Sequence, residues 1–296
     1  MDGVLVIDKP AGVTSYQCVA RLKKIWGVKK AGHTGTLDPM ATGVLPICLG
    51  EATKIARYLT EGEKVYRASM VLGIETDTLD LEGQVIARRT PAVTEGEVRE
   101  VMKRFIGKLE QKPPYFSAVK YLGKPLHRWT RQGVKVDLPA RVVEVKSLEV
   151  EKIEMPYVHF HLTCSAGTYV RVLCADMGKI LGCGASLAAL RRLKSGPFVE
   201  ADAVPFEEEK LKEKVLSLKD ALAHIPSVLV TEEWGEKIRK GIQPGREIFE
   251  GYDISSLVEG VMLKFVSPKG ELLALARWEK NGQARLNRVF QKGNIF

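Results

Sequence analysis

The sequence predicts an α+β fold: a mixed, mainly antiparallel central sheet flanked by helices and loops, followed by a small β-rich unit. Expected strands and helices follow one another without the regular βαβ rhythm of a doubly wound sheet. At 296 residues, the chain is long enough for about two domains. After Pro226 the pattern changes to short strands separated by Gly, Pro and Asn turns, which is typical of a small β-barrel or sandwich. We therefore predict domains at residues 1–227 and 228–296.

The first elements follow from turn and cap residues. An apolar strand at residues 3–7 ends in a Gly/Pro turn. A helix at 15–26 follows a hydroxyl N-cap and stops at Gly27. A loop rich in Gly and Thr, residues 32–43, then leads into a strand at 44–49.

Alternating apolar and polar residues predict the next strands, at 64–72, 84–87, 141–153 and 157–164. An acidic connection, 76–81, separates the first two. Thr94 and Glu97 form a capping box for a helix that ends at Gly107. Helical patterns predict the remaining elements, at 53–59, 168–181 with Thr168 as its cap, 186–194 and 206–223.

Composition excludes three classes of protein. No apolar run approaches the roughly 20 residues that span a bilayer. Met1 leads directly into Asp2 and a short strand, so we expect no signal peptide. Five cysteines without a CxxC pair indicate reduced, buried thiols in a cytoplasm. We therefore expect a cytoplasmic protein that is not secreted, does not span a membrane and is not stabilised by disulfide bonds.

The net charge of +9 is concentrated in a few segments. Residues 1–60 carry 8 basic and 4 acidic side chains, and residues 113–147 carry 7 and 2. In the last twenty residues, Glu279 faces an excess of basic side chains, namely Arg277, Lys280, Arg285, Arg288 and Lys292. Clusters of this kind suit a polyanionic partner, although a basic surface without a function remains the alternative.

The loop at 31–43 combines Gly and Thr with His33 and Asp38 between two ordered elements. Pro39 biases Asp38 away from helical geometry, so its carboxylate is presented from a turn. A plain Asp-Pro turn is the alternative. A phosphate-binding loop is a second one, but the GxxxxGK[ST] pattern is missing.

Arg171 lies in the first turn of the helix predicted at 168–181, where the helix dipole disfavours a cation. An anionic partner elsewhere in the chain would explain this position. A surface arginine whose head group reaches into solvent is the alternative.

Cations and aromatic rings are interleaved at 113–132, namely Lys120, Lys124, Arg128 and Arg131 with Tyr115, Phe116, Tyr121, His127 and Trp129. Cations for phosphates beside rings for bases are typical of RNA contact. The alternative is a hairpin whose rings form a local core.

We predict no metal site. His159, His161 and Cys164 are close in sequence, but the two histidines share one face of a strand and no second Cys/His pair completes a set.

Several motifs occur in one order along the chain, reading KPAGVTS at 9–15, GHTGTLDPMATGVLPICLGEATK at 32–54, KVYR at 64–67, QKPPYFSA at 111–118, GTYVR at 167–171 and LRRL at 190–193. In this order they resemble the TruB family of tRNA pseudouridine synthases. The tail, with RKGIQPG at 239–245, resembles the family's PUA-type RNA-binding domain, a small β-barrel.

The resemblance implies a pseudouridine synthase fold with one active site. Asp38 would be the catalytic carboxylate, Arg171 the partner that holds it ionised, and Tyr66 the ring that stacks on the target uracil. His33 would lie against the flipped-out nucleotide. The base pocket would be lined by Tyr169 and Leu190.

The insertion at 113–138 corresponds to the family's thumb, which grips the T-arm of tRNA. Its RNA-binding residues would be Lys120, Lys124, Arg128, Trp129 and Arg131. Here the chain reads HRWTR at 127–131, which departs from the family's usual Tyr-Glu-x-Ala-Arg pattern.

The expected function is therefore isomerisation of uridine-55 in the T-loop of tRNA to pseudouridine by a monomer. The reaction exchanges a C–N for a C–C bond on one ring, so we expect no cofactor. It requires a base outside its stack and a carboxylate whose charge an adjacent cation preserves. An RNA-binding module without activity and a glycosylase that releases uracil are the alternatives, but a hydrolase would need a second carboxylate.

Overall fold

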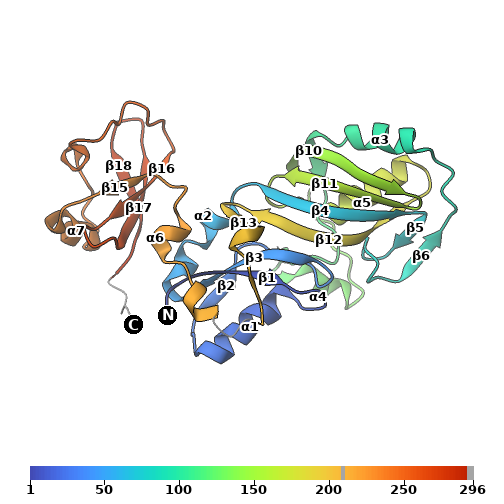
Figure 1. The fold of residues 1–296 in the computed structure, drawn as a ribbon, viewed down its shortest axis with the longest axis horizontal. Helices are drawn as coiled ribbons and strands as arrows, with labels where there is room; N and C mark the ends of the chain where they lie inside the picture. The colour runs from blue at the N-terminus through green and yellow to red at the C-terminus, as the bar shows by residue number, and fades with distance from the viewer. Residues whose placement is uncertain (208–210, 292–296) are drawn as a thin grey trace.

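The computed structural model describes residues 1–207 and 211–291, and Lys292 of the basic tail lies outside this range. The molecule is elongated in Figure 1, with a large α+β body and a smaller β-rich unit at one end. No helix within the described ranges is both long and apolar enough to cross a membrane.

A ten-stranded sheet forms the centre of the body. Eight strands follow one another across it, in the order β14 (Val204–Pro205), β1 (Gly3–Lys9), β3 (Thr42–Leu49), β12 (Ala185–Ser195), β4 (Lys64–Leu72), β11 (Tyr157–Cys164), β10 (Arg141–Glu154) and β7 (Gly107–Gln111). Two short strands pair beside this path, β2 (Ala31–His33) with β3 and β13 (Phe198–Val199) with β12. β1 with β14 and β3 with β12 are parallel, and the other pairs are antiparallel. The predicted mixed, mainly antiparallel sheet is confirmed.

Three longer helices belong to this body, α1 (Ser15–Trp26), α3 (Glu95–Lys103) and α5 (Val170–Ile180). Thr14 and Gln17 form a capping box at the start of α1, and Gly27 ends it at a φ of 65°. The predicted capping box of Thr94 and Glu97 is also confirmed. The helix it opens ends at Lys103, before the predicted Gly107, because Gly107 is the first residue of β7.

The helix predicted at 186–194 is wrong, because this segment is strand β12 between β3 and β4 in the sheet. Register shifts near Leu187 and Arg192 interrupt the regular alternation of buried and exposed side chains along β12. Without that alternation, a run of Leu, Ala and Arg has the propensity of a helix, and pairing on both edges overrides it.

The start of α5 also differs from the expectation. Its N-cap is Tyr169 and makes no side-chain cap bond, while the Thr168 hydroxyl donates to the carbonyl of Ser165. The helix predicted at 53–59 is split into a 3₁₀ turn, η1 (Gly50–Lys54), and α2 (Ala56–Thr60).

The long helix predicted at 206–223 is replaced by two short pieces, η3 (Leu211–Lys214) and α6 (Leu218–Ala221). Residues 208–210 of that prediction lie outside the described range. A short 3₁₀ turn, η2 (Glu200–Asp202), precedes β14.

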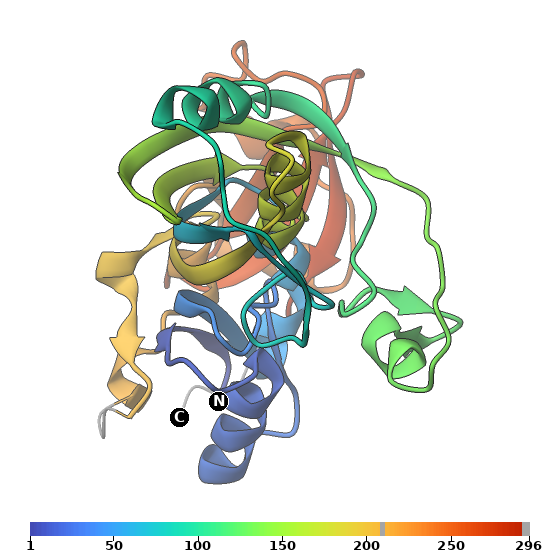
Figure 2. The same cartoon turned by 90° about the vertical axis from the view of Figure 1, so that its right-hand side faces the viewer.

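Two small hairpins extend from the body. β5 (Ile74–Thr76) pairs with β6 (Val85–Arg88). The insertion at 113–138 contains β8 (Lys120–Tyr121), β9 (Lys124–Pro125) and α4 (Leu126–Thr130). Figure 2 shows this insertion, in green, projecting away from the rest of the chain.

The C-terminal unit is an open sheet. Its strands lie in the order β15 (Ser227–Leu229), β16 (Met262–Val266), β17 (Leu272–Trp278) and β18 (Ala284–Val289). α7 (Glu232–Arg239) and η4 (Arg246–Phe249) complete the unit. Within the described ranges, β15 and β18 do not pair with each other, so these strands do not close the expected barrel.

The two parts of the molecule share a hydrophobic cluster. Leu275 and Phe290 of the C-terminal unit belong to the same buried cluster as Val4, Val44 and Ile55 of the body. A separate core that includes Phe265 and Trp278 lies inside the C-terminal unit. This unit therefore has a core of its own and also packs against the body.

Candidate active site

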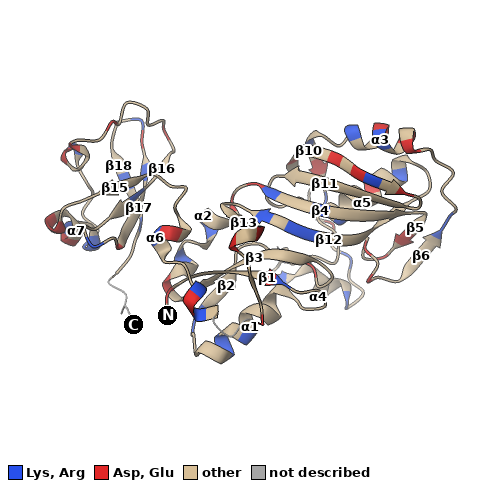
Figure 3. Ribbon diagram, in the orientation of Figure 1, with Lys and Arg blue, Asp and Glu red and all other residues tan. Residues whose placement is uncertain are grey.

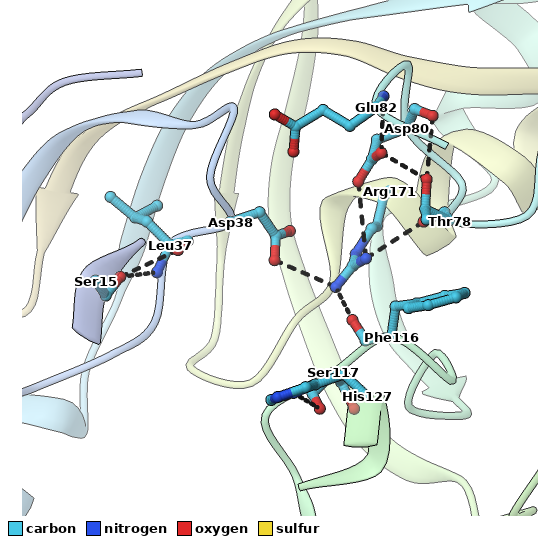
Figure 4. A network of polar contacts seen from close by, with 10 residues as sticks. All are labelled: Ser15, Leu37, Asp38, Thr78, Asp80, Glu82, Phe116, Ser117, His127 and Arg171. Atoms are coloured by element: carbon cyan, nitrogen blue, oxygen red, sulfur yellow. Dashed lines mark hydrogen bonds and ion pairs between the residues drawn. The ribbon is translucent and has the colours of Figure 1, made fainter. Parts of the chain in front are cut away.

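The loop that carries Asp38 is held on both sides by buried polar side chains. The Ser15 hydroxyl donates to the carbonyl of Leu37 at 3.0 Å and accepts from its N–H at 2.9 Å. On the other side, the buried Lys9 ammonium donates to the carbonyl of Pro39 at 3.1 Å. The backbone around Asp38 is therefore fixed from α1 and β1, as Figure 4 shows for Ser15 and Leu37.

Arg171, on α5, connects this loop to two other segments, the acidic connection at 76–81 and the start of the insertion. Its Nη2 donates to Asp38 Oδ1 at 3.2 Å and to the carbonyl of Phe116 at 2.7 Å. Its Nη1 donates to the carbonyl of Thr78 at 3.3 Å and lies 3.7 Å from Asp80 Oδ2. The predicted anionic partner of Arg171 is therefore confirmed, and Figure 4 shows the guanidinium between its two carboxylates.

Asp80 is a site residue that the sequence reasoning missed. Its side chain is 5% exposed, and its Oδ1 accepts from the Thr78 hydroxyl at 2.6 Å and from the Glu82 N–H at 3.1 Å. Two backbone hydrogen bonds between Leu187 and the segment around Asp80 hold it on β12. The acidic connection at 76–81 was the one signal in the sequence, and it does not show that Asp80 is buried.

Two opposing effects act on the Asp38 carboxylate, whose side chain is 28% exposed. Burial raises the pKa of Asp38, and the nearby Asp80 raises it further, while Arg171 and Lys9 lower it. The net direction is upward, so burial outweighs the cation. Arg171 therefore limits the rise of the pKa rather than reversing it.

Tyr66 and Leu190 lie on the paired strands β4 and β12. Tyr66 is opposite Arg192 and Leu190 is opposite Ala68 in the register. Tyr66 is 7% and Leu190 is 8% exposed, and burial raises the pKa of the Tyr66 hydroxyl. The pairing places Tyr66, implied to stack on the uracil, and Leu190, implied to line its pocket, on adjacent strands.

His33 ends β2 opposite Ile47 of β3, and within the described ranges no hydrogen bond or ion pair joins it to Asp38. With Tyr16 and Lys23 it lines a groove of about 460 Å³ between α1 and β2. Its buried Nδ1 has no hydrogen-bond partner within the described ranges. Burial, followed by the charge of Arg192, lowers the pKa of His33, which favours the neutral imidazole.

Tyr169 is held by Gln111 at the start of α5. The Tyr169 N–H donates to Gln111 Oε1 at 2.9 Å, and Gln111 Nε2 donates to the Tyr169 carbonyl at 3.2 Å. Burial raises the pKa of the Tyr169 hydroxyl, while the charge of Arg171 lowers it. Gln111 is the last residue of β7, just before the insertion, so its two contacts join Tyr169 to the base of the insertion.

The insertion presents exposed cations, namely Lys120, Lys124, Arg128 and Arg131. Within 1–207 and 211–291, none of the four forms an ion pair. Figure 3 shows further basic residues along α1. Trp129 packs edge-on against Tyr121, and Lys124 lies 5.4 Å from the centre of its ring, so the rings also form a small local cluster.

The histidines of β11 and Cys164 do not converge. His159 accepts from or donates to the Ser69 hydroxyl at 2.6 Å, and His161 lies 3.2 Å from Glu151. Cys164 is on the opposite, buried face of the strand. No group of three His, Cys, Asp or Glu side chains suited to a metal ion occurs in the part of the chain that the structure describes. All five cysteines are free and buried, as expected.

Comparisons with known proteins agree over nearly the whole chain. Residues 23–170 match the model of the TruB family pseudouridylate synthase N-terminal domain, and residues 171–248 match that of the tRNA pseudouridylate synthase B C-terminal domain. A tRNA pseudouridine synthase B from Syntrophus aciditrophicus is 47% identical over 94% of this chain and 91% of its own. One from Geobacter sulfurreducens is 45% identical over 98% of this chain and 100% of its own.

Solved structures show the same fold. A Cbf5–Nop10–Gar1 complex contains a chain that is 29% identical, with a TM-score of 0.70 over 98% of this chain and 85% of that one. An H/ACA RNP bound to a substrate RNA containing 2'-deoxyuridine gives 26% identity and a TM-score of 0.69 over 99% and 86%. With relatives this similar over nearly their full length, the chain belongs to the TruB family of pseudouridylate synthases.

Proposed function

We propose that this chain isomerises uridine-55 in the T-loop of tRNA to pseudouridine, with Asp38 as the catalytic carboxylate. Family membership carries the coarser part of this statement, the conversion of uridine to pseudouridine in tRNA. The observation that supports the role of Asp38 is its partly exposed carboxylate, bound to a guanidinium that is 5% exposed.

The chemistry needs few groups. The bond between C1′ of the ribose and N1 of uracil breaks, a bond between C1′ and C5 of the same ring forms, and the proton on C5 is lost while N1 gains one. No electrons or phosphate groups are transferred, so we propose no cofactor. Asp38 acts by attacking the sugar, adding to the ring or abstracting a sugar proton, and all three need its ionised form.

The target base must leave its stack before it can reach Asp38. We assign Tyr66 to stacking on the flipped uracil, and Leu190 and Tyr169 to the walls of its pocket. The burial of Tyr66 and Leu190 on adjacent strands supports an apolar pocket that retains the detached base. We assign His33, in the groove beside α1, to contact with the flipped-out nucleotide.

Arg171 supplies the charge that this site requires. A carboxylate that loses water tends to take up a proton, and an adjacent cation opposes that tendency. The contact at 3.2 Å and the direction of the Arg171 effect on the pKa of Asp38 support this role.

We propose that the T-arm is held by the exposed cations and ring of the insertion, namely Lys120, Lys124, Arg128, Trp129 and Arg131. The four cations are exposed and form no ion pair within the described ranges, which supports phosphate contact, and Trp129 is half-buried beside them. We further propose a catalytic domain at 1–227, with the insertion as its thumb, and a PUA-like RNA-binding domain at 228–296. The protein would act as a monomer in the cytoplasm.

Two alternative functions place different demands on the site. An RNA-binding module without activity has no need for a buried guanidinium at a partly exposed carboxylate. A glycosylase would need a second carboxylate that positions water. Asp80 contacts the same guanidinium as Asp38 and is therefore the candidate for a second carboxylate. Its side chain is only 5% exposed, however, and already accepts hydrogen bonds from Thr78 and Glu82, so it is not placed to position a water molecule.

The test is incubation of an unmodified T-arm transcript with the protein, without metal or nucleotide, followed by nucleoside analysis. We expect pseudouridine from the wild type, none from Asp38→Asn, and none from a transcript with cytidine at position 55. Free uracil would indicate the glycosylase instead. Equal amounts of pseudouridine from both proteins would contradict the role of Asp38, and product from the cytidine transcript would contradict the position.

A further inference from the structure

Arg192 is a charged side chain of the LRRL motif to which neither the family resemblance nor the proposed reaction assigns a role. It is 1% exposed and among the largest fully buried side chains of the molecule. Within the described ranges it forms no ion pair with a carboxylate. A buried guanidinium without a counter-ion costs free energy unless its N–H groups donate to oxygen atoms. The hydrogen-bond partners of Arg192 therefore indicate its structural role.

Those contacts are with the backbone of the loop that carries Asp38 and with β3. Nε donates to the carbonyl of Val44 at 2.8 Å, and Nη2 donates to the carbonyl of Gly35 at 3.1 Å. Arg192 is also opposite Tyr66 in the register of β12 and β4, and its charge opposes the effect of burial, which raises the pKa of the Tyr66 hydroxyl. Gly35 precedes Asp38 by three residues, so one side chain holds the Asp38 loop and lies on the strand beside the ring assigned to the uracil.

The backbone of β3 next to Arg192 requires a glycine. At Gly43, which has a φ of 101°, a Cβ would lie 2.2 Å from the Arg192 carbonyl oxygen. Only glycine permits β3 to come this close to β12 at that point. The close approach brings Val44 O within reach of the Arg192 guanidinium.

The preceding residue provides a natural contrast. Arg191 is 33% exposed and pairs with Asp8 at 2.8 Å and with Glu200 at 2.5 Å. It has the same side chain on the same strand, but its charge is compensated at the surface and it contacts no residue of the proposed pocket. Arg191 is therefore a matched control.

We propose that Arg192 is a positioning residue for pseudouridine formation, which fixes the Asp38 loop through the carbonyl of Gly35 and places its charge beside Tyr66. This inference rests on the proposed function. Lysine cannot replace it fully, because a single ammonium on a flexible stem cannot reproduce the planar fork that contacts separate oxygen atoms.

The test measures single-turnover rate and dissociation constant on the T-arm transcript for Arg192→Met, Arg192→Lys and the control Arg191→Met. We expect Arg192→Met to lower the rate at saturating RNA by about 10- to 100-fold and to change the dissociation constant by less than about threefold. Arg192→Lys should recover part of the rate, and Arg191→Met should stay within about threefold of the wild type.

Coupling to Tyr66 separates positioning from a general loss of structure. In a Tyr66→Phe background the hydroxyl is gone, so Arg192→Met should cost a smaller factor than it does in the wild type. An NMR titration of His33, identified with His33→Gln, gives a second readout. Its pKa should rise in Arg192→Met, where the charge is lost, and return toward the wild-type value in Arg192→Lys.

The inference is overturned if Arg192→Met keeps the wild-type rate, if Arg191→Met loses as much, or if the Tyr66→Phe background leaves the Arg192→Met factor unchanged. Should Arg192→Met fail to fold in a thermal unfolding control, Arg192→Lys decides alone: a rate within threefold of the wild type contradicts the inference. Failure of the proposed function looks different, because the wild type itself would then form no pseudouridine.

Discussion

Arg171 and Arg128 carry the same guanidinium group in very different surroundings. Arg171 is buried in α5 and lies between Asp38 and Asp80, with backbone carbonyls as its other partners. Arg128 is exposed on α4 of the insertion and forms no ion pair in the described part of the chain. One charge is thus balanced inside the protein, and the other is exposed to solvent without a carboxylate partner among the described residues.

From this difference we expect the two regions to have separate roles, one in the reaction and one in RNA binding. A buried cation acts on the groups it touches and is screened little by salt, so its effect is on the state of Asp38. Exposed cations act over a distance on phosphates and depend strongly on salt, so their effect is on binding. We therefore expect changes near Arg171 to alter turnover and changes in the insertion to alter affinity.

A large loss of rate is expected for Asp80→Asn, which removes a charge and keeps the shape of the side chain. Arg171 loses one of its two fixed carboxylates, and we expect the single-turnover rate at saturating RNA to fall about 10- to 100-fold, or about 1.4 to 2.7 kcal/mol. The control is Glu75→Gln, which removes an exposed, ion-paired carboxylate of the neighbouring β5. Equal losses in both variants would contradict a specific role for Asp80.

The pH dependence of the rate tests the burial of Asp38. Burial raises the pKa of Asp38 above its ordinary value of 3.8, and the reaction needs the ionised form, so the rate should decline on acidification at a pH clearly above 3.8. Asp80→Asn should move this decline to lower pH, because Asp80 raises the pKa of Asp38. A profile that stays flat down to pH 4 would show that Asp38 is not the titrating group.

The salt dependence of binding tests the insertion. Arg128→Ala with Arg131→Ala should weaken T-arm binding about tenfold at low salt. Each lost phosphate contact should reduce the slope of log K against log salt by about 0.7 to 0.9. Lys103→Ala, which removes an ion-paired cation of α3, is the control. An unchanged slope in the double variant would mean that the insertion does not meet phosphates.

A separate effect, on stability and not on the reaction, concerns Lys64, a buried cation of β4. Its ammonium donates to the Thr60 carbonyl and the Ser195 hydroxyl, each at 3.1 Å, and burial lowers its pKa to about 8. The unfolded chain binds this proton up to about pH 10, so the free energy of unfolding should rise with pH from about 8 to 10.

Lys64→Met should remove about 2 kcal/mol of that rise, measured by urea unfolding at both pH values. Lys24→Met on α1 should leave it in place. Identical pH dependence in the wild type and Lys64→Met would contradict the lowered pKa of Lys64.

The sequence predicted one contact of the site from a residue that violates a local preference of helices. A cation in the first turn of a helix pointed to an anionic partner, and Arg171 has two. Asp80 was missed because its burial depends on contacts with β12, more than 100 residues away in the chain. Arg192 was missed for a related reason, since an arginine beside another arginine resembles a surface residue until both strands next to it are known.

The strands, too, were predicted correctly where the local pattern was regular and missed where it was not. Strands with regular alternation, such as β4 and β11, were predicted at their observed bounds. β12 was predicted as a helix, because the irregular register that seats Leu190 and Arg192 removes its alternation. The feature that positions the site is thus the one that hid the strand.

The most direct test places Arg171→Met beside the double variant Arg128→Ala, Arg131→Ala on one T-arm transcript. Single-turnover rate at saturating RNA and dissociation constant are measured for each. We predict that Arg171→Met loses at least about 100-fold in rate and keeps its dissociation constant within about threefold, whereas the double variant weakens binding and keeps its rate. If both variants lost rate and affinity in the same proportion, the division between buried and exposed charges would be wrong.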